Sequence, residues 1–283
     1  MSAAPDHPTH DTAPAPAAMR RFPMELMPFE SHSIEFPDGT RTMPGEPLLR
    51  DSALCRASLR SLATFCPIED PANPPRVIDL GCREGGFALE FARAGYEVLG
   101  LEARESNVAR CRLVQDSHDL PNLSFVVDDA RFVGSYGRFD AAFCCGLLYH
   151  LDRPVEHVMA LGAITDRLLI LNTHYADFPP SPYFALSEMT EHEGVLGKWY
   201  VDLPPGVSLE EMEASRGASW GNEHSFWVER RHLLETIRRA GFDMVLEQHD
   251  FLDDIPGEAP SWWDEQQRSQ FLGVRTAAVV AAA

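Results

Sequence analysis

The sequence has no apolar run near the roughly 18 residues that a membrane-spanning helix needs, and its first residues form no hydrophobic signal core. We therefore expect neither a membrane span nor export. Basic residues are scarce, because 24 Lys and Arg stand against 43 Asp and Glu, which gives a formal net charge of −19. Nucleic acid and anionic lipid both require a basic face, so neither is an expected partner.

Metal-ligand spacings are also missing. The six cysteines stand in apolar or helix-like contexts, at positions 55, 66, 82, 111, 144 and 145. This pattern favours buried, reduced thiols in a cytoplasmic chain over a disulfide framework. His157 and the pair His192-Glu193 have no partners at a plausible spacing, so no metal is predicted.

One stretch of the chain, Val77 to Glu102, carries the strongest pattern. An apolar run ends at Leu80, a glycine-containing turn follows, and a helix-like stretch stops at Gly95. A second apolar run then ends on Glu102. Such a β-turn-α-β unit binds an adenosine-containing ligand across the carboxyl ends of its strands, and Glu102 can accept hydrogen bonds from both ribose hydroxyls.

The turn lacks the third glycine of a dinucleotide fingerprint. Its glycines fall as G-x-x-x-G-G instead of G-x-G-x-x-G. We expect Glu84 to face the ligand, where a carboxylate would repel a pyrophosphate. S-adenosylmethionine carries a sulfonium cation, an amino-acid tail and no phosphate, so it is the favoured ligand. The alternative is an ordinary α/β turn with solvated acids.

Asp79-Leu80-Gly81-Cys82, with Gly85 and the later Glu102, resembles motif I of the class I S-adenosylmethionine-dependent methyltransferases. A third strand, Leu123 to Val127, is followed by Asp129-Ala130. This acid-then-Ala step resembles the motif of the same family that pairs with the adenine amino group, and Asp128 is the alternative acid. This sequence departs from the family at Arg83-Glu84, where many relatives carry small residues, which leaves the path of the loop open. The resemblance implies cofactor contacts for Asp79, Gly81, Cys82, Arg83, Gly85, Glu102, Ala103, Asp129 and Ala130.

A fourth strand, 139–145, leads into Gly146-Leu147-Leu148-Tyr149-His150. The stretch FDAAFCCGLLYHLDRPVEHV resembles motif IV of the family, and is similar over about twenty residues to the tRNA wobble-uridine carboxymethyltransferases. In motif IV the strand end faces the transferring methyl group, which implies a cofactor contact for Cys145 and a catalytic place for Tyr149 and His150. The alternative for His150 is a histidine that caps the loop.

After a fifth strand, 168–172, the chain runs to about Trp227 without clear periodicity and is rich in aromatics. A loop of this length is improbable in a compact domain unless it is functional. Its position matches the place where the family inserts a substrate-binding cap, although these aromatics can also build the cap's own core. His174 and His224 join His150 as candidate bases, with His224 favoured. Predicted substrate contacts are Tyr175, Trp199, Trp220 and Asn222.

The expected fold is α/β: a Rossmann-like, seven-stranded, mostly parallel sheet with helices on both faces and an antiparallel last strand. A disordered tail (1–20) precedes a segment (21–70) that either forms a lid over the cofactor or packs on the sheet flank. This segment holds a hairpin signal at 33–42 and an amphipathic helix at 48–65. Three parts follow: the cofactor-binding core (71–172), the cap (173–228) and the rest of the sheet (229–283). The last part is expected to hold a helix at 229–240 and strands at 244–248 and 271–280. An acidic, aromatic loop lies between these two strands.

The expected function is methyl transfer from S-adenosylmethionine to an O or N nucleophile, less readily C, of a small, neutral or cationic, partly apolar metabolite in specialised biosynthesis. One alternative is a tRNA wobble-base modifier. Such an enzyme requires a basic patch, whereas the insertion before Trp220 has only two basic residues, Lys198 and Arg216. Another is a cofactor-binding relic without catalysis, which the intact acids disfavour. A monomer or homodimer is expected.

Overall fold

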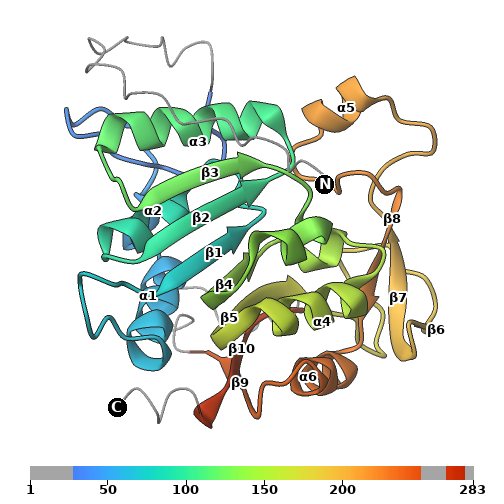
Figure 1. Cartoon of the computed structure of the whole chain (residues 1–283). Helices are drawn as coiled ribbons and strands as arrows, with labels where there is room; N and C mark the ends of the chain where they lie inside the picture. The colour runs from blue at the N-terminus through green and yellow to red at the C-terminus, as the bar shows by residue number, and fades with distance from the viewer. Residues whose placement is uncertain (1–27, 250–265, 278–283) are drawn as a thin grey trace, which may run out of the picture.

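The computed structural model describes residues 28–249 and 266–277 (Figure 1). The predictions for the tail at 1–20 and for the acidic loop fall outside the described residues. The strands of the large sheet are β1 (Arg76–Leu80), β2 (Glu97–Glu102), β3 (Leu123–Val127), β4 (Phe139–Cys145), β5 (Thr165–His174), β9 (Met244–Gln248) and β10 (Arg268–Val274). The strands of a smaller sheet are β6 (Thr190–His192), β7 (Val195–Val201) and β8 (His224–Val228).

The large sheet has the order β3-β2-β1-β4-β5-β10-β9. Strands β1 to β5 pair in parallel, and β10 runs antiparallel between β5 and β9. This confirms the predicted sheet. The strand order reverses at β1, which lies between β2 and β4, and a ligand crevice is expected where the carboxyl ends of such strands diverge.

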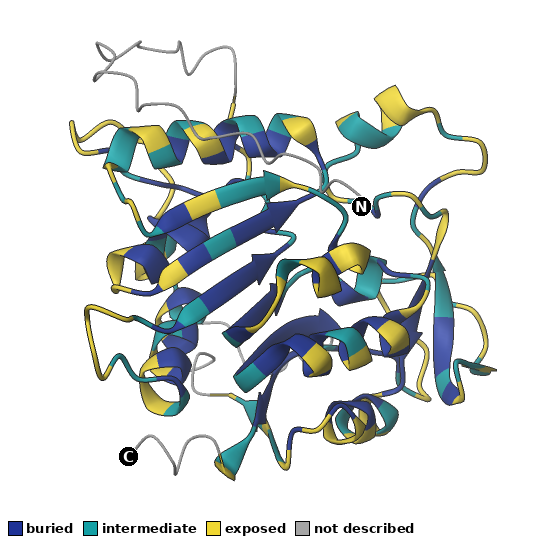
Figure 2. Ribbon diagram, viewed as in Figure 1, coloured by how far each residue is buried: buried dark blue, intermediate teal, exposed yellow. Residues whose placement is uncertain are grey.

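Helices cover both faces of the sheet (Figure 1). Their bounds are α1 (Ala53–Phe65), α2 (Gly86–Arg93), α3 (Glu105–His118), α4 (Pro154–Ile164), α5 (Leu209–Ala214) and α6 (Arg230–Arg239), with 3₁₀ turns η2 (Leu49–Asp51), η3 (Ala130–Tyr136) and η4 (Leu148–His150). Successive strand side chains point to opposite faces. Val77 therefore packs with Phe91 of α2 in one core, and Ile78 packs with Val158 of α4 in the other. Figure 2 shows the central strands buried and the outer faces of the helices exposed.

Several element boundaries differ from the predictions for local reasons. The helix expected from residue 48 begins with the turn η2 and becomes α1 at Ala53, where Ser52 caps it by accepting the N–H of Cys55 at 3.2 Å. Ser106, expected to cap the next helix, lies inside α3 instead, and its N–H donates to Glu213 at 3.0 Å. Strand β5 extends to His174 because β10 pairs with it as far as that residue.

The segment after β5 contains more regular structure than its lack of periodicity indicated. A turn at Glu193 and Gly194, both with positive φ, joins β6 to β7, and β8 pairs antiparallel with β7. The hairpin predicted at 33–42 forms as a short one. Glu35 and Arg41 make an antiparallel bridge, and the N–H groups of Phe36 and Thr42 donate to the carbonyls of Thr40 and Ile34 at 2.9 and 3.0 Å. Within the described ranges, 28–249 and 266–277, no helix has the length and apolarity to cross a bilayer.

Candidate active site

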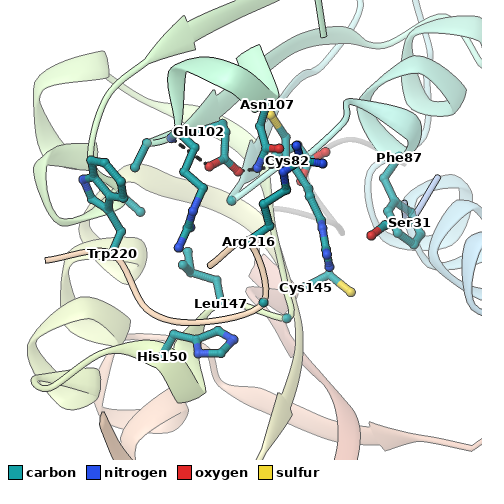
Figure 3. Close-up of a pocket in the computed structure, with 18 of the residues that line it drawn as sticks. Ser31, Cys82, Phe87, Glu102, Asn107, Cys145, Leu147, His150, Arg216 and Trp220 are labelled. Atoms are coloured by element: carbon teal, nitrogen blue, oxygen red, sulfur yellow. Dashed lines mark hydrogen bonds between the residues drawn. The ribbon is translucent and has the colours of Figure 1, made fainter. Parts of the chain in front are cut away.

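A cavity of about 430 Å³ opens at the carboxyl ends of β1, β2 and β4 (Figure 3). Side chains of the segment before α1 and of residues 216–220 in the insertion also line it. Two segments that are distant in sequence from the β1–β2 unit, the one before α1 and residues 216–220, thus form two walls of the cavity. Of the residues singled out in the sequence, those that line it are Asp79, Gly81, Cys82, Arg83, Glu102, Ala103, Asp129, Ala130, Cys145, Tyr149, His150 and Trp220.

Glu102 lies at the tip of β2 and is 5% exposed. Its carboxylate accepts the backbone N–H of Arg83 at 3.0 Å and the backbone N–H of Arg104 at 2.9 Å. Burial raises the pKa of Glu102, although these hydrogen bonds oppose the shift. Each carboxylate oxygen has two acceptor positions, so the group can also accept a pair of ribose hydroxyls.

Asp79 lies on β1 and is 2% exposed, and its Oδ2 atom has no hydrogen-bond partner among the described residues. Burial raises the pKa of Asp79 to about 8. A buried carboxyl group with an unused oxygen at a cavity wall is suited to a cationic amine. S-adenosylmethionine carries such an amine on its amino-acid tail. The two carboxyl groups of the cavity, Glu102 and Asp79, therefore fit this cofactor as acceptors at its ribose and at the amine of its tail.

Glu84 does not line the cavity, so the expectation that it faces the ligand is wrong. It is 1% exposed, and its carboxylate accepts the backbone N–H groups of Glu30, Ser31 and His32 at 2.8, 3.1 and 2.9 Å. The carboxylate turns away from the cavity because these donors, all from the segment before α1, surround it. The Arg83-Glu84 departure from the family pattern thus anchors a distant segment to the turn.

Gly85 shapes the same turn without lining the cavity. Its φ is +77°, and a Cβ atom at this position would lie 2.8 Å from the ring of Phe125. An L side chain would therefore be strained and crowded here. Gly85 thus fixes the backbone path of the turn, and its contact with the cofactor stays a prediction.

Asp129 lines the cavity at the start of η3. Its carboxylate caps η3 through the N–H of Arg131 at 2.9 Å and forms an ion pair with the Arg131 guanidinium. Asp128, the alternative acid, accepts the hydroxyl of Tyr136 at 2.6 Å and does not line the cavity. Asp129 is thus the acid within reach of a ligand, and its pairing with adenine stays a prediction.

His150 is held by a buried carboxylate from the insertion. Its Nδ1 atom lies 2.7 Å from Oδ2 of Asp202, whose side chain is 3% exposed. The hydroxyl of Ser225 donates to the same oxygen at 2.6 Å, and the N–H of Ser219 donates to Oδ1 at 3.0 Å. With Asp202 ionised, Nδ1 carries the imidazole proton and Nε2 can accept one.

The other two candidate bases lie outside the cavity. His174 stacks on Trp227 with ring centroids 4.8 Å apart, and its Nδ1 donates to the carbonyl of Gln266 at 2.8 Å. Burial, and then the charge of Arg268, lower the pKa of His174 to about 3. His224 is exposed at the start of β8. The preference for His224 as the base is therefore not supported, because solvent surrounds it and the cavity does not reach it.

Most of the predicted substrate contacts have structural roles instead. Tyr175 is buried against Phe271, and Trp199 packs on Phe226 of the small sheet. The Asn222 amide donates to the backbone carbonyls of His150 and His224, each at 3.0 Å. Of the four, Trp220 alone lines the cavity. The aromatic residues of the insertion mainly build its own core.

Two arginines of the site carried no signal in the sequence. Arg104 donates through Nη2 to the carbonyls of Ser215, Ala218 and Ser219 at 2.9, 2.9 and 3.1 Å, which ties the insertion to the end of β2. Arg268 of β10 also lines the cavity. Its Nε donates to the Asn172 side chain at 2.8 Å, and its guanidinium lies 5.6 Å from the ring centroid of Tyr149. Among the described side chains, no group of three or more His, Cys, Asp and Glu is arranged to hold a metal ion.

Comparisons with known proteins show what the chain is similar to. Residues 77–166 match a family model described as a methyltransferase domain. A mitochondrial ubiquinone biosynthesis O-methyltransferase of Arabidopsis thaliana is 29% identical over 116 residues, which are 40% of this chain and 35% of the relative. A ubiquinone biosynthesis O-methyltransferase of Rhodopseudomonas palustris (strain HaA2) is 25% identical over 167 residues, 56% of this chain and 61% of the relative. The chain thus spans between about a third and three fifths of these relatives.

A solved structure covers more of the chain. The N-terminal domain of EvdMO1 with S-adenosylhomocysteine (SAH) bound superposes with a TM-score of 0.63 at 25% identity, over 88% of this chain and 92% of that one. The same domain in the presence of SAH and D-fucose gives the same TM-score at 23% identity, again over 88% of this chain and 92% of that one. The residues that line the cavity, the matched domain and the strand order of the sheet all indicate a methyltransferase that uses S-adenosylmethionine. Residues 77–166 are a methyltransferase domain, the fold is that of the class I S-adenosylmethionine-dependent methyltransferases, and S-adenosylmethionine is the cofactor.

Proposed function

We propose that this chain methylates a hydroxyl oxygen of a small molecule, with His150 as the general base. The observation that carries the proposal is the pair of His150 and Asp202 at the cofactor cavity, with 2.7 Å between Nδ1 and Oδ2. A hydroxyl nucleophile must lose its proton, whereas many nitrogen and carbon nucleophiles need only alignment. An imidazole oriented by a buried carboxylate is therefore suited to an oxygen acceptor.

When bound, S-adenosylmethionine supplies a methyl group activated by a sulfonium sulfur. Glu102 and Asp79 would hold its ribose and amine, and Arg104 keeps the insertion over the cavity. Nε2 of His150 takes the proton of the acceptor hydroxyl, and Asp202 stabilises the imidazolium that results. Alignment supplies most of the remaining rate, since well-oriented partners reach effective concentrations of roughly 10⁵–10⁸ M.

The acceptor is proposed to be rich in oxygen and neutral or anionic, which revises the earlier preference for a neutral or cationic one. Four arginines line the cavity against three acids, Asp79, Glu102 and Asp129; the arginines are at positions 83, 104, 216 and 268. This balance of charge disfavours a cationic acceptor. Arg216 forms an ion pair with Glu30, whereas Arg268 lies beside Tyr149 near the proposed base. The names of the similar proteins support the same class, because they mention ubiquinone biosynthesis O-methyltransferases and D-fucose.

The test is methyl transfer from S-adenosylmethionine labelled with ¹³C in its methyl group to a panel of quinols, phenols and sugars. NMR of the product identifies the atom that received the methyl group, and we expect oxygen. Replacing His150 with Ala should lower turnover roughly 10²–10⁴-fold, with the affinity for SAH unchanged. Asp202→Asn should also lower turnover, because the carboxylate that orients the His150 imidazole is lost.

The matched control is His224→Ala, because this histidine is exposed and lies outside the cavity. It should retain the wild-type rate and pH profile. Methyl transfer to nitrogen or carbon, or wild-type turnover in His150→Ala, would contradict the proposal.

A further inference from the structure

The segment before α1 carries a buried histidine to the start of α2. The backbone of His32 is fixed by the Glu84 carboxylate, and its Nδ1 accepts the N–H of Gly86, the first residue of α2, at 3.0 Å. Its ring lies edge-on to Phe87 with centroids 5.6 Å apart and an interplanar angle of 86°. Backbone and ring are therefore both held, and the ring lines the cofactor cavity.

These contacts determine which nitrogen of His32 carries the proton. Since Gly86 donates to Nδ1, Nδ1 must be the unprotonated nitrogen of a neutral ring. The ring is 8% exposed, and burial followed by the charge of Arg83 lowers the pKa of His32 to about 3. The proton is therefore on Nε2. Within residues 28–249 and 266–277, Nε2 has no acceptor, and because the ring lines the cavity this N–H can donate to a ligand there.

Arg83 provides a second donor at the same part of the cavity. Its guanidinium is close enough to act electrostatically on His32, and no hydrogen-bond or ion-pair partner of this group occurs in the described part of the chain. The first N–H groups of a helix also favour an anion, and α2 begins at Gly86. The first N–H of α2, that of Gly86, is already donated to His32, so the donors left for a ligand are Nε2–H of His32 and the Arg83 guanidinium. A neutral N–H donor and a cation from two segments of the chain suit a carboxylate.

We propose that His32 and Arg83 bind the carboxylate of the cofactor's amino-acid tail, with Nε2–H and the guanidinium as donors. Asp79, which lines the same cavity, supplies the opposite charge for the amine of that tail. The segment before α1 packs Phe29, Ile34 and Phe36 into the core beside α2. The proposal makes the same segment part of the cofactor site, with Glu84 as the residue that positions it. This inference rests on the cofactor of the proposed function and not on the acceptor.

The test compares two ligands that differ by the carboxylate alone. SAH and its decarboxylated analogue, the adenosyl thioether with a 3-aminopropyl chain, are titrated by calorimetry into the full-length wild type and variants. Hydrogen bonds to a charged group predict that the wild type prefers SAH by roughly ten- to a hundredfold. The ratio of the two dissociation constants should fall to within a fewfold of one in His32→Phe.

Arg83→Gln provides a second variant, because its side chain does not support the segment as the ring of His32 does. It too should lose the preference for SAH. Glu102→Gln is the matched control: it should weaken both ligands by a similar factor, because it acts on the ribose, and should keep the preference.

A histidine that only packs the segment would weaken both ligands equally when replaced. An unchanged ratio in both His32→Phe and Arg83→Gln would therefore overturn the carboxylate site while leaving the proposed function intact. Equal affinity of the wild type for both ligands would overturn it in the same way. Failure of the wild type to bind either ligand would overturn the carboxylate site and the proposed function together.

Discussion

The carboxylate of Glu84 accepts the backbone N–H of His32 at 2.9 Å, across 52 residues of sequence. The N–H groups of Glu30 and Ser31 donate to the same carboxylate. Glu84, in the turn that follows β1, therefore holds the segment before α1 over the cavity. Glu84 is also one of the two residues at which the sequence departs from the family pattern. The ion pair of Arg216 with Glu30 joins the segment before α1 to the insertion, which lines the other side of the cavity.

Glu84→Gln should release this segment. In glutamine an NH2 group, which donates, replaces one of the two acceptor oxygens of the carboxylate. At least one buried backbone N–H therefore loses its partner. The free energy of unfolding should fall by about 2 kcal/mol. In hydrogen exchange, the amides of residues 30–32 should lose their protection while those of β1 keep it.

Glu90→Gln is the matched control for this change, because Glu90 pairs locally with Arg93 on α2. Its effect on stability should be below about 1 kcal/mol, and the amides of residues 30–32 should stay protected. Unchanged protection of these amides in Glu84→Gln would show that other contacts hold the segment.

Binding of SAH should release a proton near neutral pH. In the free protein, burial raises the pKa of Asp79 to about 8, so this carboxyl group is mostly protonated at pH 7. A cationic amine beside it favours the carboxylate and expels the proton. Affinity should therefore rise with pH until the pH passes the raised pKa of Asp79 in the free protein.

Calorimetry in two buffers of different ionisation enthalpy measures this proton directly. Asp79→Asn should bind more weakly and release no proton from this position. If the wild type took up a proton on binding, or exchanged none, the amine would not contact Asp79.

The parts of the site that lie on local patterns could be predicted from the sequence. Asp79 and Glu102 each end a buried strand, and parallel strands bring such ends to one edge of a sheet. The glycine turn between them indicated a backbone that must approach a ligand. These features need only residues 77 to 102, and the structure brings both acids to the cavity.

The rest of the site depends on contacts between distant segments. Asp202 lies 52 residues from His150, in a segment without clear periodicity. The motif IV resemblance gave His150 a catalytic place, yet the sequence favoured His224 as the base. The choice of His150 comes from the exposure of His224 and from the Asp202 carboxylate beside His150. Glu84 was assigned to the ligand because its partners, the N–H groups of residues 30–32, cannot be seen in the turn itself.

A crystal structure of the complex with SAH shows whether the cavity brings the transferring methyl group to His150. We expect both ribose hydroxyls to donate to the carboxylate of Glu102 and the sulfur atom to face the space beside Tyr149 and His150. A sulfur atom turned away from His150, or a ribose that does not contact Glu102, would contradict it.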